Sequence, residues 1–357
     1  MKMILIRVIL AVVLLVLVGI TILSIQRYFG QQEKIKISKA LVQNGGISEV
    51  RKVKLGGVNQ YILIEGSKKT NPILLMLHGG PGSPFPFGVS SRSTFPELTK
   101  DFTVVYWDQR GAGKSYNKNI HKDSINLDQL VSDGNELVDY LRDEFSQEQI
   151  NLAGQSWGTV IGLNLVNRYP EKFNKYVANA QIVSIPESQK VGYDWLKTKA
   201  EKDQKLKNEL EKLGNHPYKE REREKIFGDL LKKNGAYTYK NENGEGVSEL
   251  SLIKGAWTSP DYTLKDLYAG LVSGFLFSWN DSFFKEFVNY DFSEINNIQV
   301  PMTIIQGKED YIAPRKVTEV FVEGQKFREK HKYILLEDTA HFADLEEMVK
   351  LINDALK

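Results

Sequence analysis

A serine between two glycines stands where the chain passes from a strand-like to a helical pattern. The pentapeptide GQSWG at residues 154–158 follows the apolar run INLA and precedes the helix-like run TVIGLNLVNRY. The pattern G-x-S-x-G alone arises by chance in roughly one chain in ten, so its setting carries the argument. A tight strand-to-helix turn projects a serine hydroxyl, the glycines leave room around it, and the helix dipole favours negative charge beside it. Ser156 is therefore a candidate nucleophile, and the alternative is an ordinary glycine-rich turn.

The same alternation of strand and helix patterns extends through most of the chain. Runs such as ILLML at 73–77 and TVVYW at 103–107 are continuously apolar, which is typical of strands buried on both faces. Helical patterns occupy 127–145, 157–168 and 342–356. We therefore expect an α/β fold with a mostly parallel sheet and helices on both faces. The expected strands are 50–55, 61–64, 73–77, 103–107, 150–152, 176–183, 302–305 and 333–336, the first two forming an antiparallel hairpin through Gly56-Gly57.

The alternation stops between about 184 and 298. More than half of the residues in 196–233 are charged, with leucines at spacings of four and three, which predicts an amphipathic helix. Aromatic residues are concentrated in 255–292. We expect residues 185–298 to form an inserted helical cap, with most of its rings packed in its own core and some facing a pocket. The catalytic domain would then comprise 48–184 and 299–357.

An apolar segment near the N-terminus predicts a membrane helix. Residues 8–25 carry no charge, and a helix of this length spans roughly 27 Å, close to the hydrocarbon thickness of a bilayer. A cleaved signal peptide and a buried core helix are the alternatives, but no A-x-A-like cleavage site follows the segment. We expect a transmembrane anchor at 1–27 and a tether, or a short helix, at 28–47.

The position of the body relative to the membrane is less constrained. Positive residues flank both ends of the apolar segment, so the positive-inside rule does not decide. Short N-terminal tails usually stay inside. We therefore expect a single-pass protein of the cell membrane, with its catalytic domain on the extracytoplasmic side and the lipid bilayer as a partner of the N-terminal helix.

An activated serine needs a base, and the base needs an acid that orients it. On a scaffold of this kind these residues follow the serine in the order acid, then histidine. Asp310 follows the predicted strand at 302–305, and His341 follows the one at 333–336. Glu309 is the alternative acid, while Asp338 and Asp344 are less favoured. The remaining histidines (His78, His121, His216 and His331) lie in another motif, in polar loops or in a charged turn.

Two further motifs follow predicted strands. HGGPG at 78–82 follows ILLML, and its glycines allow backbone amides to approach a substrate oxygen. We expect an oxyanion hole formed by the backbone N–H of Gly80, or of Gly79, together with that of Trp157, with His78 holding the loop. A purely conformational turn is the alternative.

The run DQRGAGKS at 108–115 contains GKS, as phosphate-binding loops do, but Asp108 stands where a Walker loop has its first glycine. Asp108 and Arg110 are therefore expected to make structural hydrogen bonds near the rim of the site.

Composition excludes several other classes of function. The chain contains no cysteine, which excludes disulfides, a thiol nucleophile and cysteine-ligated metal clusters. Its formal net charge of +2 argues against a large nucleic-acid surface. No metal-binding motif such as H-E-x-x-H occurs. We expect no cofactor and no metal.

The motifs together resemble those of a known family. HGGPG, DQRGAGKS, GQSWG, GKED (307–310) and AHF (340–342) resemble the α/β-hydrolase superfamily and, within it, the proline iminopeptidase (S33 peptidase) group. The resemblance covers roughly residues 50–356. It implies that Ser156, Asp310 and His341 form the triad and that the insertion is a helical cap. It further implies removal of an N-terminal residue, often proline, from short peptides, with acids of the cap holding the free α-amine.

The resemblance is weaker at several positions. The group usually has glycine where this chain has Gln155, and some members have a glutamate where Tyr311 stands. No motif identifies the amine-binding acids, for which the candidates are Glu249, Asp261, Asp281 and Glu286.

We therefore expect a serine hydrolase, with a short peptide as first choice of substrate and an ester, acylglycerol or lactone as the alternative. A catalytically silent binding module on the same fold is the alternative from another class.

Overall fold

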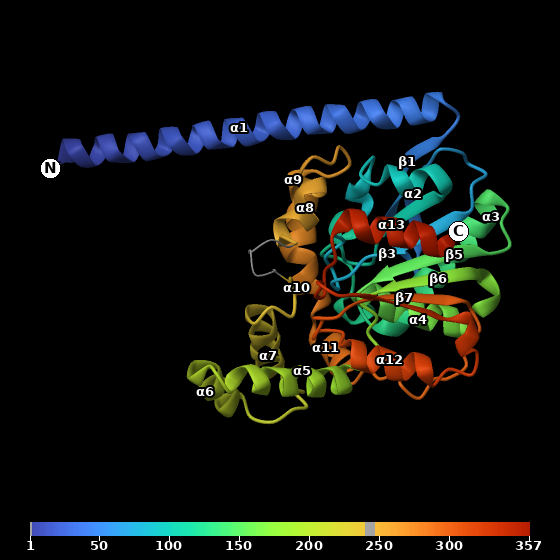
Figure 1. Cartoon of the computed structure of the whole chain (residues 1–357). Helices are drawn as coiled ribbons and strands as arrows, with labels where there is room; N and C mark the ends of the chain where they lie inside the picture. The colour runs from blue at the N-terminus through green and yellow to red at the C-terminus, as the bar shows by residue number, and fades with distance from the viewer. Residues whose placement is uncertain (1, 240–246) are drawn as a thin grey trace.

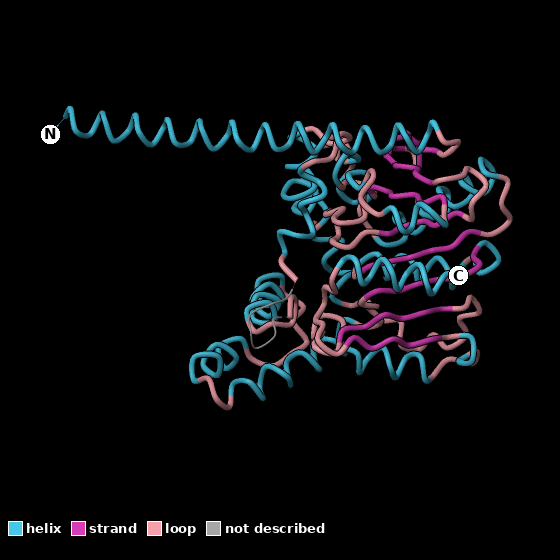
Figure 2. The backbone as a smooth tube through the Cα atoms, turned by 45° about the horizontal axis from the view of Figure 1, so that its top comes forward, coloured by secondary structure: helices cyan, strands magenta, loops and turns pink. Residues whose placement is uncertain are grey.

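The computed structural model describes residues 2–239 and 247–357. Strands in this part form one sheet in the order β1-β2-β4-β3-β5-β6-β7-β8 (Figures 1 and 2). Neighbouring strands from β4 to β8 are parallel, whereas β2 runs antiparallel to both β1 and β4. The strands are β1 (Ile47–Leu55), β2 (Val58–Gly66), β3 (Ile73–Leu77), β4 (Thr103–Asp108), β5 (Ile150–Gln155), β6 (Phe173–Asn179), β7 (Met302–Gly307) and β8 (Lys332–Leu336).

The fold class expected from the sequence is confirmed, including the hairpin at one edge. Leu55 pairs with Val58 across the turn formed by Gly56 and Gly57, both of which have positive φ. Several observed strand boundaries differ from the predicted ones, and the largest difference is at the end of β6. β6 begins at Phe173 and ends at Asn179, so the buried residues 180–183, all apolar except Gln181, lie outside any strand.

Helices cover both faces of the sheet, and this explains the continuous apolar runs. In β3, Leu75 and Leu77 pack with α3 and α4 on one face, while Leu74 and Met76 pack with α2 and α13 on the other. The helices outside the insertion are α1 (Lys2–Gln43), α2 (Pro96–Asp101), α3 (Leu127–Phe145), α4 (Trp157–Arg168), α12 (Arg315–Glu323) and α13 (Leu345–Leu356).

The described part of the segment between β6 and β7 is mostly helical. The charged part forms its own small core, in which Leu206, Leu210 and Leu213 of α6 pack against α7. The aromatic part packs in the main core, where Phe283 contacts Trp157. The helices are α5 (Ile185–Ala200), α6 (Gln204–Leu213), α7 (Arg221–Lys233), α8 (Glu249–Trp257), α9 (Leu264–Tyr268), a π-helical turn (Ala269–Ser273), α10 (Gly274–Ser278) and α11 (Asp281–Val288).

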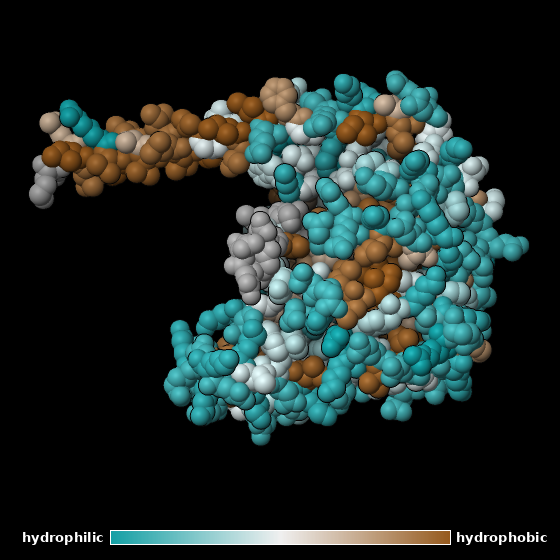
Figure 3. Space-filling model, in the orientation of Figure 1, coloured by the Kyte–Doolittle hydropathy of each residue, from teal (hydrophilic) through white to brown (hydrophobic). Residues whose placement is uncertain are grey.

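Helix α1 has two different halves. The half from Met3 to Ile25 projects away from the body and is predominantly apolar, with Arg7 as its one charged residue (Figures 1 and 3). By length and composition it could cross a membrane. The half that follows, expected as a tether or a short helix, continues the same helix to Gln43 and lies along the body, where Ser38 is buried.

Candidate active site

The ends of four strands meet at one edge of the sheet. β3, β5, β7 and β8 are parallel, so their carboxyl ends share that edge. His78 follows β3 and Ser156 follows β5. Asp310 and His341 lie in the turns after β7 and β8. The topology thus brings together residues that are far apart in the sequence.

Ser156 occupies a strained turn. Its φ is 50° and its ψ is −120°, a conformation that a residue with a side chain rarely adopts. The glycines on either side make this turn possible, because a Cβ on Gly154 would lie 2.8 Å from the carbonyl oxygen of Gly158. Trp157 begins α4, so the helix N-terminus lies directly behind the serine.

Three predicted residues form one hydrogen-bonded chain. The Oγ of Ser156 lies 2.8 Å from Nε2 of His341, and Nδ1 of His341 lies 3.0 Å from Oδ2 of Asp310. All three side chains are buried, with Ser156 the most exposed at 9%. Of the two adjacent acids considered from the sequence, Asp310 is the one that contacts the histidine.

The carboxylate of Asp310 is held from several sides. Its Oδ1 accepts hydrogen bonds from the backbone N–H groups of Ile312 and Ala313, each at 2.9 Å. Its Oδ2 accepts one from the side-chain amide of Gln306 as well as facing His341. These bonds fix the orientation of the carboxylate relative to the imidazole ring.

The HGGPG loop lies against the serine. A Cβ built on Gly79 would lie 3.4 Å from the Cβ of Ser156, so the loop backbone passes within contact distance. Gly80 has a φ of +114°, which a residue with a side chain would adopt only with strain. The N–H of Trp157, at the first position of α4, has no partner within its own helix. The HGGPG loop and the start of α4 therefore both lie close to Ser156.

His78 connects two loops and does not reach the serine hydroxyl as His341 does. Its Nε2 accepts a hydrogen bond from the backbone N–H of Gln109 at 3.1 Å, so the ring proton is on Nδ1, which donates to the carbonyl of Gly79 at 2.7 Å. Burial lowers the pKa of His78 to about 4. The ring is therefore neutral at pH 7.

Asp108, at the end of β4 and next to the His78 partner Gln109, is a buried hydrogen-bond acceptor. It accepts hydrogen bonds from the backbone N–H groups of Val89 and Lys114 and from the hydroxyl of Tyr262. Burial raises the pKa of Asp108 to about 7, against the effect of these hydrogen bonds.

Arg110 forms a bidentate ion pair with Asp133 at 2.7 and 2.8 Å, and both side chains are almost fully buried. Its guanidinium also donates to the carbonyl of Gly56 in the hairpin turn. Arg110 thus joins the loop after β4 to α3 and to the edge of the sheet.

A family model described as the alpha/beta hydrolase fold matches residues 72–347, which is more than half of the chain. The chain belongs to the α/β-hydrolase fold family. This hydrolase is 28% identical over 304 residues to the probable aminopeptidase YbaC of Bacillus subtilis (strain 168), covering 84% of the chain and 93% of the relative. It is 23% identical over 320 residues to the proline iminopeptidase of Lactobacillus helveticus (strain DPC 4571), covering 85% and 96%.

Solved structures show the same fold. A proline iminopeptidase-related protein from Thermus thermophilus superposes with a TM-score of 0.58 at 19% identity, covering 87% of this chain and 97% of that one. The epoxide hydrolase VrEH1 from Vigna radiata superposes with a TM-score of 0.53 at 20% identity, covering 86% and 96%. Both likenesses support the fold of the hydrolase.

Three of the four acids considered for amine binding have described side chains, and each of these makes an ion pair or a hydrogen bond with another residue. Asp261 pairs with Arg92, and Asp281 pairs with Arg221. Glu286 accepts a hydrogen bond from the backbone N–H of Leu127. The side chain of Glu249 lies outside the described residues.

One neighbour of the site was missed in the sequence. The ring of Tyr237, after α7, stacks on the imidazole of His341 with centroids 5.9 Å apart. The backbone of the same segment accepts hydrogen bonds from the N–H groups of His341 and Phe342. Tyr237 lies in a turn region without a periodic pattern, so the sequence held no signal for this contact.

Proposed function

We propose that this α/β-hydrolase is a serine hydrolase in which Ser156 is the nucleophile, His341 the general base and Asp310 the orienting acid. The chain of hydrogen bonds from Ser156 through His341 to Asp310 carries the proposal. A nucleophile, a base and an orienting acid within hydrogen-bonding distance are what acyl transfer requires.

The proposed reaction proceeds through an acyl-enzyme. Nε2 of His341 takes the proton of Ser156 as Oγ forms a bond to the carbonyl carbon of the substrate. The same proton then passes to the leaving nitrogen as the C–N bond breaks. Water repeats the sequence on the ester, so that the acid product leaves and Ser156 regains its proton.

The negative charge of each tetrahedral intermediate needs fixed donors. The N–H groups of Trp157 and of Gly80, or of Gly79, are proposed to hold it, because these segments lie beside the hydroxyl. His78, Asp108 and Arg110 are proposed to support the loops that carry these amides. Their hydrogen bonds join the loops to one another and to the sheet.

The proposed substrate is a short peptide with a free N-terminus. The similarity to a probable aminopeptidase and to a proline iminopeptidase supports this choice. Residues 185–298 are proposed to form the cap over a catalytic domain made of 48–184 and 299–357. In this proposal the cap supplies the peptide-binding contacts.

We also propose that residues 1–27 anchor the protein in the cell membrane as a single span, with the body on the extracytoplasmic side. The apolar half of α1 supports the anchor, since it is long enough to cross a bilayer and projects from the body. Because α1 continues to Gln43, most of the segment 28–47 would act as a rigid helical support.

A matched substrate pair tests the peptidase proposal. The full-length protein in detergent should hydrolyse prolyl- or aminoacyl-naphthylamides and lose activity when the same α-amine is acetylated. The Ser156→Ala variant should be inactive toward the naphthylamides with a free α-amine and toward the acetylated ones. Hydrolysis of nitrophenyl acyl esters with no hydrolysis of the amides would overturn the peptidase proposal while retaining the nucleophile. Equal activity of Ser156→Ala would overturn the mechanism.

A further inference from the structure

Exposed apolar side chains gather on one stripe of the insertion. Leu264, Tyr268, Leu271 and Phe275 follow one another at spacings of four, three and four residues along α9, the π-helical turn and α10. Together with Leu276 they form what we call the outer stripe, whose members are between 41% and 68% exposed. Single exposed apolar residues are ordinary, but a contiguous set marks a contact surface.

The opposite side of the same helical segment is also apolar and is buried. Leu267 and Phe277 pack in the core, and the carbonyl of Gly274 lies directly against Gly82 of the HGGPG loop. One side of this helical segment is therefore buried against the body. The outer stripe is a second apolar face, which makes no contribution to the core.

Polar residues of α1 hold the chain immediately before the stripe. The guanidinium of Arg27 donates to the carbonyls of Trp257 and Tyr262, and Gln31 donates to that of Ser259 at 2.9 Å. Lys34 donates to the carbonyl of Gly255 at 3.0 Å. We call these contacts the α1 clamp.

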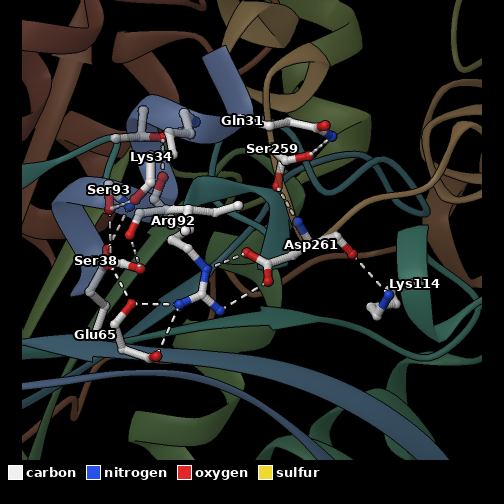
Figure 4. A network of polar contacts seen from close by, with 12 residues as sticks. Gln31, Lys34, Ser38, Glu65, Arg92, Ser93, Lys114, Ser259 and Asp261 are labelled. Carbon is white, nitrogen blue, oxygen red and sulfur yellow. Dashed lines mark hydrogen bonds and ion pairs between the residues drawn. The ribbon is translucent and has the colours of Figure 1, made fainter. Parts of the chain in front are cut away.

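A buried polar network supports the α1 clamp from below (Figure 4). Arg92 forms a bidentate ion pair with Asp261 at 2.7 and 2.9 Å, within the segment that α1 holds. Lys114 donates to the backbone carbonyl of Asp261, and Lys34 also donates to the hydroxyl of Thr94. These contacts fix the direction of α1 relative to the start of α9.

The position of the α1 clamp indicates where a bilayer crossed by α1 would end. The apolar run of α1 ends at Ile25, and Arg27 is the first residue of the clamp. A bilayer crossed by α1 therefore ends close to Arg27, whose contact Tyr262 is two residues before the stripe begins at Leu264. The apolar half of α1 extends past α8, α9 and α10 on the side of the body where these helices lie (Figures 1 and 2).

We propose that the outer stripe rests on the surface of the bilayer that α1 crosses. Leucine, phenylalanine and tyrosine side chains on one face of a helix are typical of helices that lie in a membrane interface. The protein would then have two membrane contacts, one spanning and one interfacial. The second would place the HGGPG loop, beneath Gly274, near the lipid surface. The inference rests on the proposed anchoring by α1.

The absence of cysteine from the chain allows a direct test. Leu276→Cys places a single label on the stripe, and Val320→Cys on α12 is a matched control, since these residues are 68% and 67% exposed. Leu15→Cys reports on the anchor. Each full-length variant carries an environment-sensitive fluorophore and is reconstituted into phosphatidylcholine–phosphatidylglycerol vesicles with and without spin-labelled lipid. Circular dichroism confirms that each labelled variant is folded.

We expect spin-labelled lipid to quench the labels at positions 15 and 276 at least threefold more than the label at 320. Quenching at 15, with positions 276 and 320 quenched equally, would overturn the stripe contact and leave the anchor standing. Lack of quenching at 15 would overturn the anchor and the stripe proposal with it. As a second variant, Leu271→Glu in the Leu276→Cys background should reduce quenching at 276 toward that at 320. Unchanged quenching there would contradict a contact made by the stripe.

Discussion

The candidate active site and the α1 clamp are both built from polar contacts between distant segments, but they use different partners. At the site, the contacts that join Ser156, His341 and Asp310 are between side chains. At the clamp, side chains of α1 donate mainly to backbone carbonyls. Every residue has a backbone carbonyl, so a clamp contact constrains the identity of the donor in α1 but not that of the residue that accepts the hydrogen bond. Substitutions should therefore have large effects at the site and small ones at the clamp.

The largest effect should follow from removing the charge of Asp310, the proposed orienting acid. In Asp310→Asn, the amide oxygen would remain with the N–H groups of Ile312 and Ala313, and its NH2 would face His341. The imidazole would then carry its proton on Nε2 and could not accept one from Ser156. We expect kcat for the best substrate to fall about 10³- to 10⁴-fold.

Glu309→Gln is the matched control for this prediction, since Glu309 is the neighbouring acid and was the alternative in the sequence. Steady-state kinetics should show less than about a threefold change, because no charge at the histidine is altered. A greater loss in Glu309→Gln than in Asp310→Asn would reverse the assignment of the acid.

The second-largest effect should be a loss of stability on breaking the buried ion pair between Arg110 and Asp133. Arg110→Met should lower the free energy of unfolding by about 3–5 kcal/mol, because it leaves the buried carboxylate of Asp133 without its ion pair. Urea denaturation of the detergent-solubilised protein measures this change. Arg51→Met removes partly exposed contacts with Glu49, Glu144 and the hydroxyl of Tyr140 and should cost no more than about 1 kcal/mol. Equal losses in the two variants would show that burial does not govern the effect.

His78 should make the scaffold sensitive to acid. Its pKa is about 4 in the folded protein, below the ordinary value of 6.5, so the unfolded chain binds more protons between these values. Stability from this group is fully present above pH 6.5 and is lost as pH falls toward 4. From pH 7.5 to 4.5 the wild type should lose about 2–3 kcal/mol more than His78→Asn in urea denaturation. Parallel pH curves for the two proteins would refute a neutral buried His78.

The smallest effect is expected at the clamp. Lys34→Met retains the aliphatic chain and removes the hydrogen bonds to Thr94 and to the carbonyl of Gly255. We expect a loss of about 1 kcal/mol, seen as a lower melting temperature in detergent. Lys39→Met, at an exposed position of the same helix, should leave the melting temperature unchanged. A loss in Lys34→Met as large as that in Arg110→Met would break the contrast between the two regions.

The same contrast explains what the sequence could predict. The fold class followed from the continuous apolar runs, and the contact between Ser156, Asp310 and His341 followed from motifs at strand ends, because this chemistry allows few residue types. The catalytic roles of these residues remain predictions. The segment that carries the clamp was expected as a tether or a short helix, and its contacts with the body were not predicted, because backbone acceptors leave no motif. A signal did exist, since Arg27, Gln31, Lys34 and Ser38 repeat at helical spacing on one face.

The contact of Tyr237 with His341 and the extent of β6 could not be predicted for another reason. Tyr237 reaches the site from an insertion whose path depends on the whole fold. The residues after Asn179 are buried and mostly apolar as in a strand, yet Ala180 has a positive φ and the chain turns there. Burial alone did not distinguish a strand from the turn that follows it.

Covalent labelling tests the central claim most directly. The wild-type protein, in its native state, is treated with a fluorophosphonate, and the modified peptide is identified by mass spectrometry. The account predicts one adduct on Ser156, none in Ser156→Ala, and much slower labelling in His341→Ala, where the base is absent. An unlabelled wild type, or equal labelling of Ser156→Ala, would contradict it.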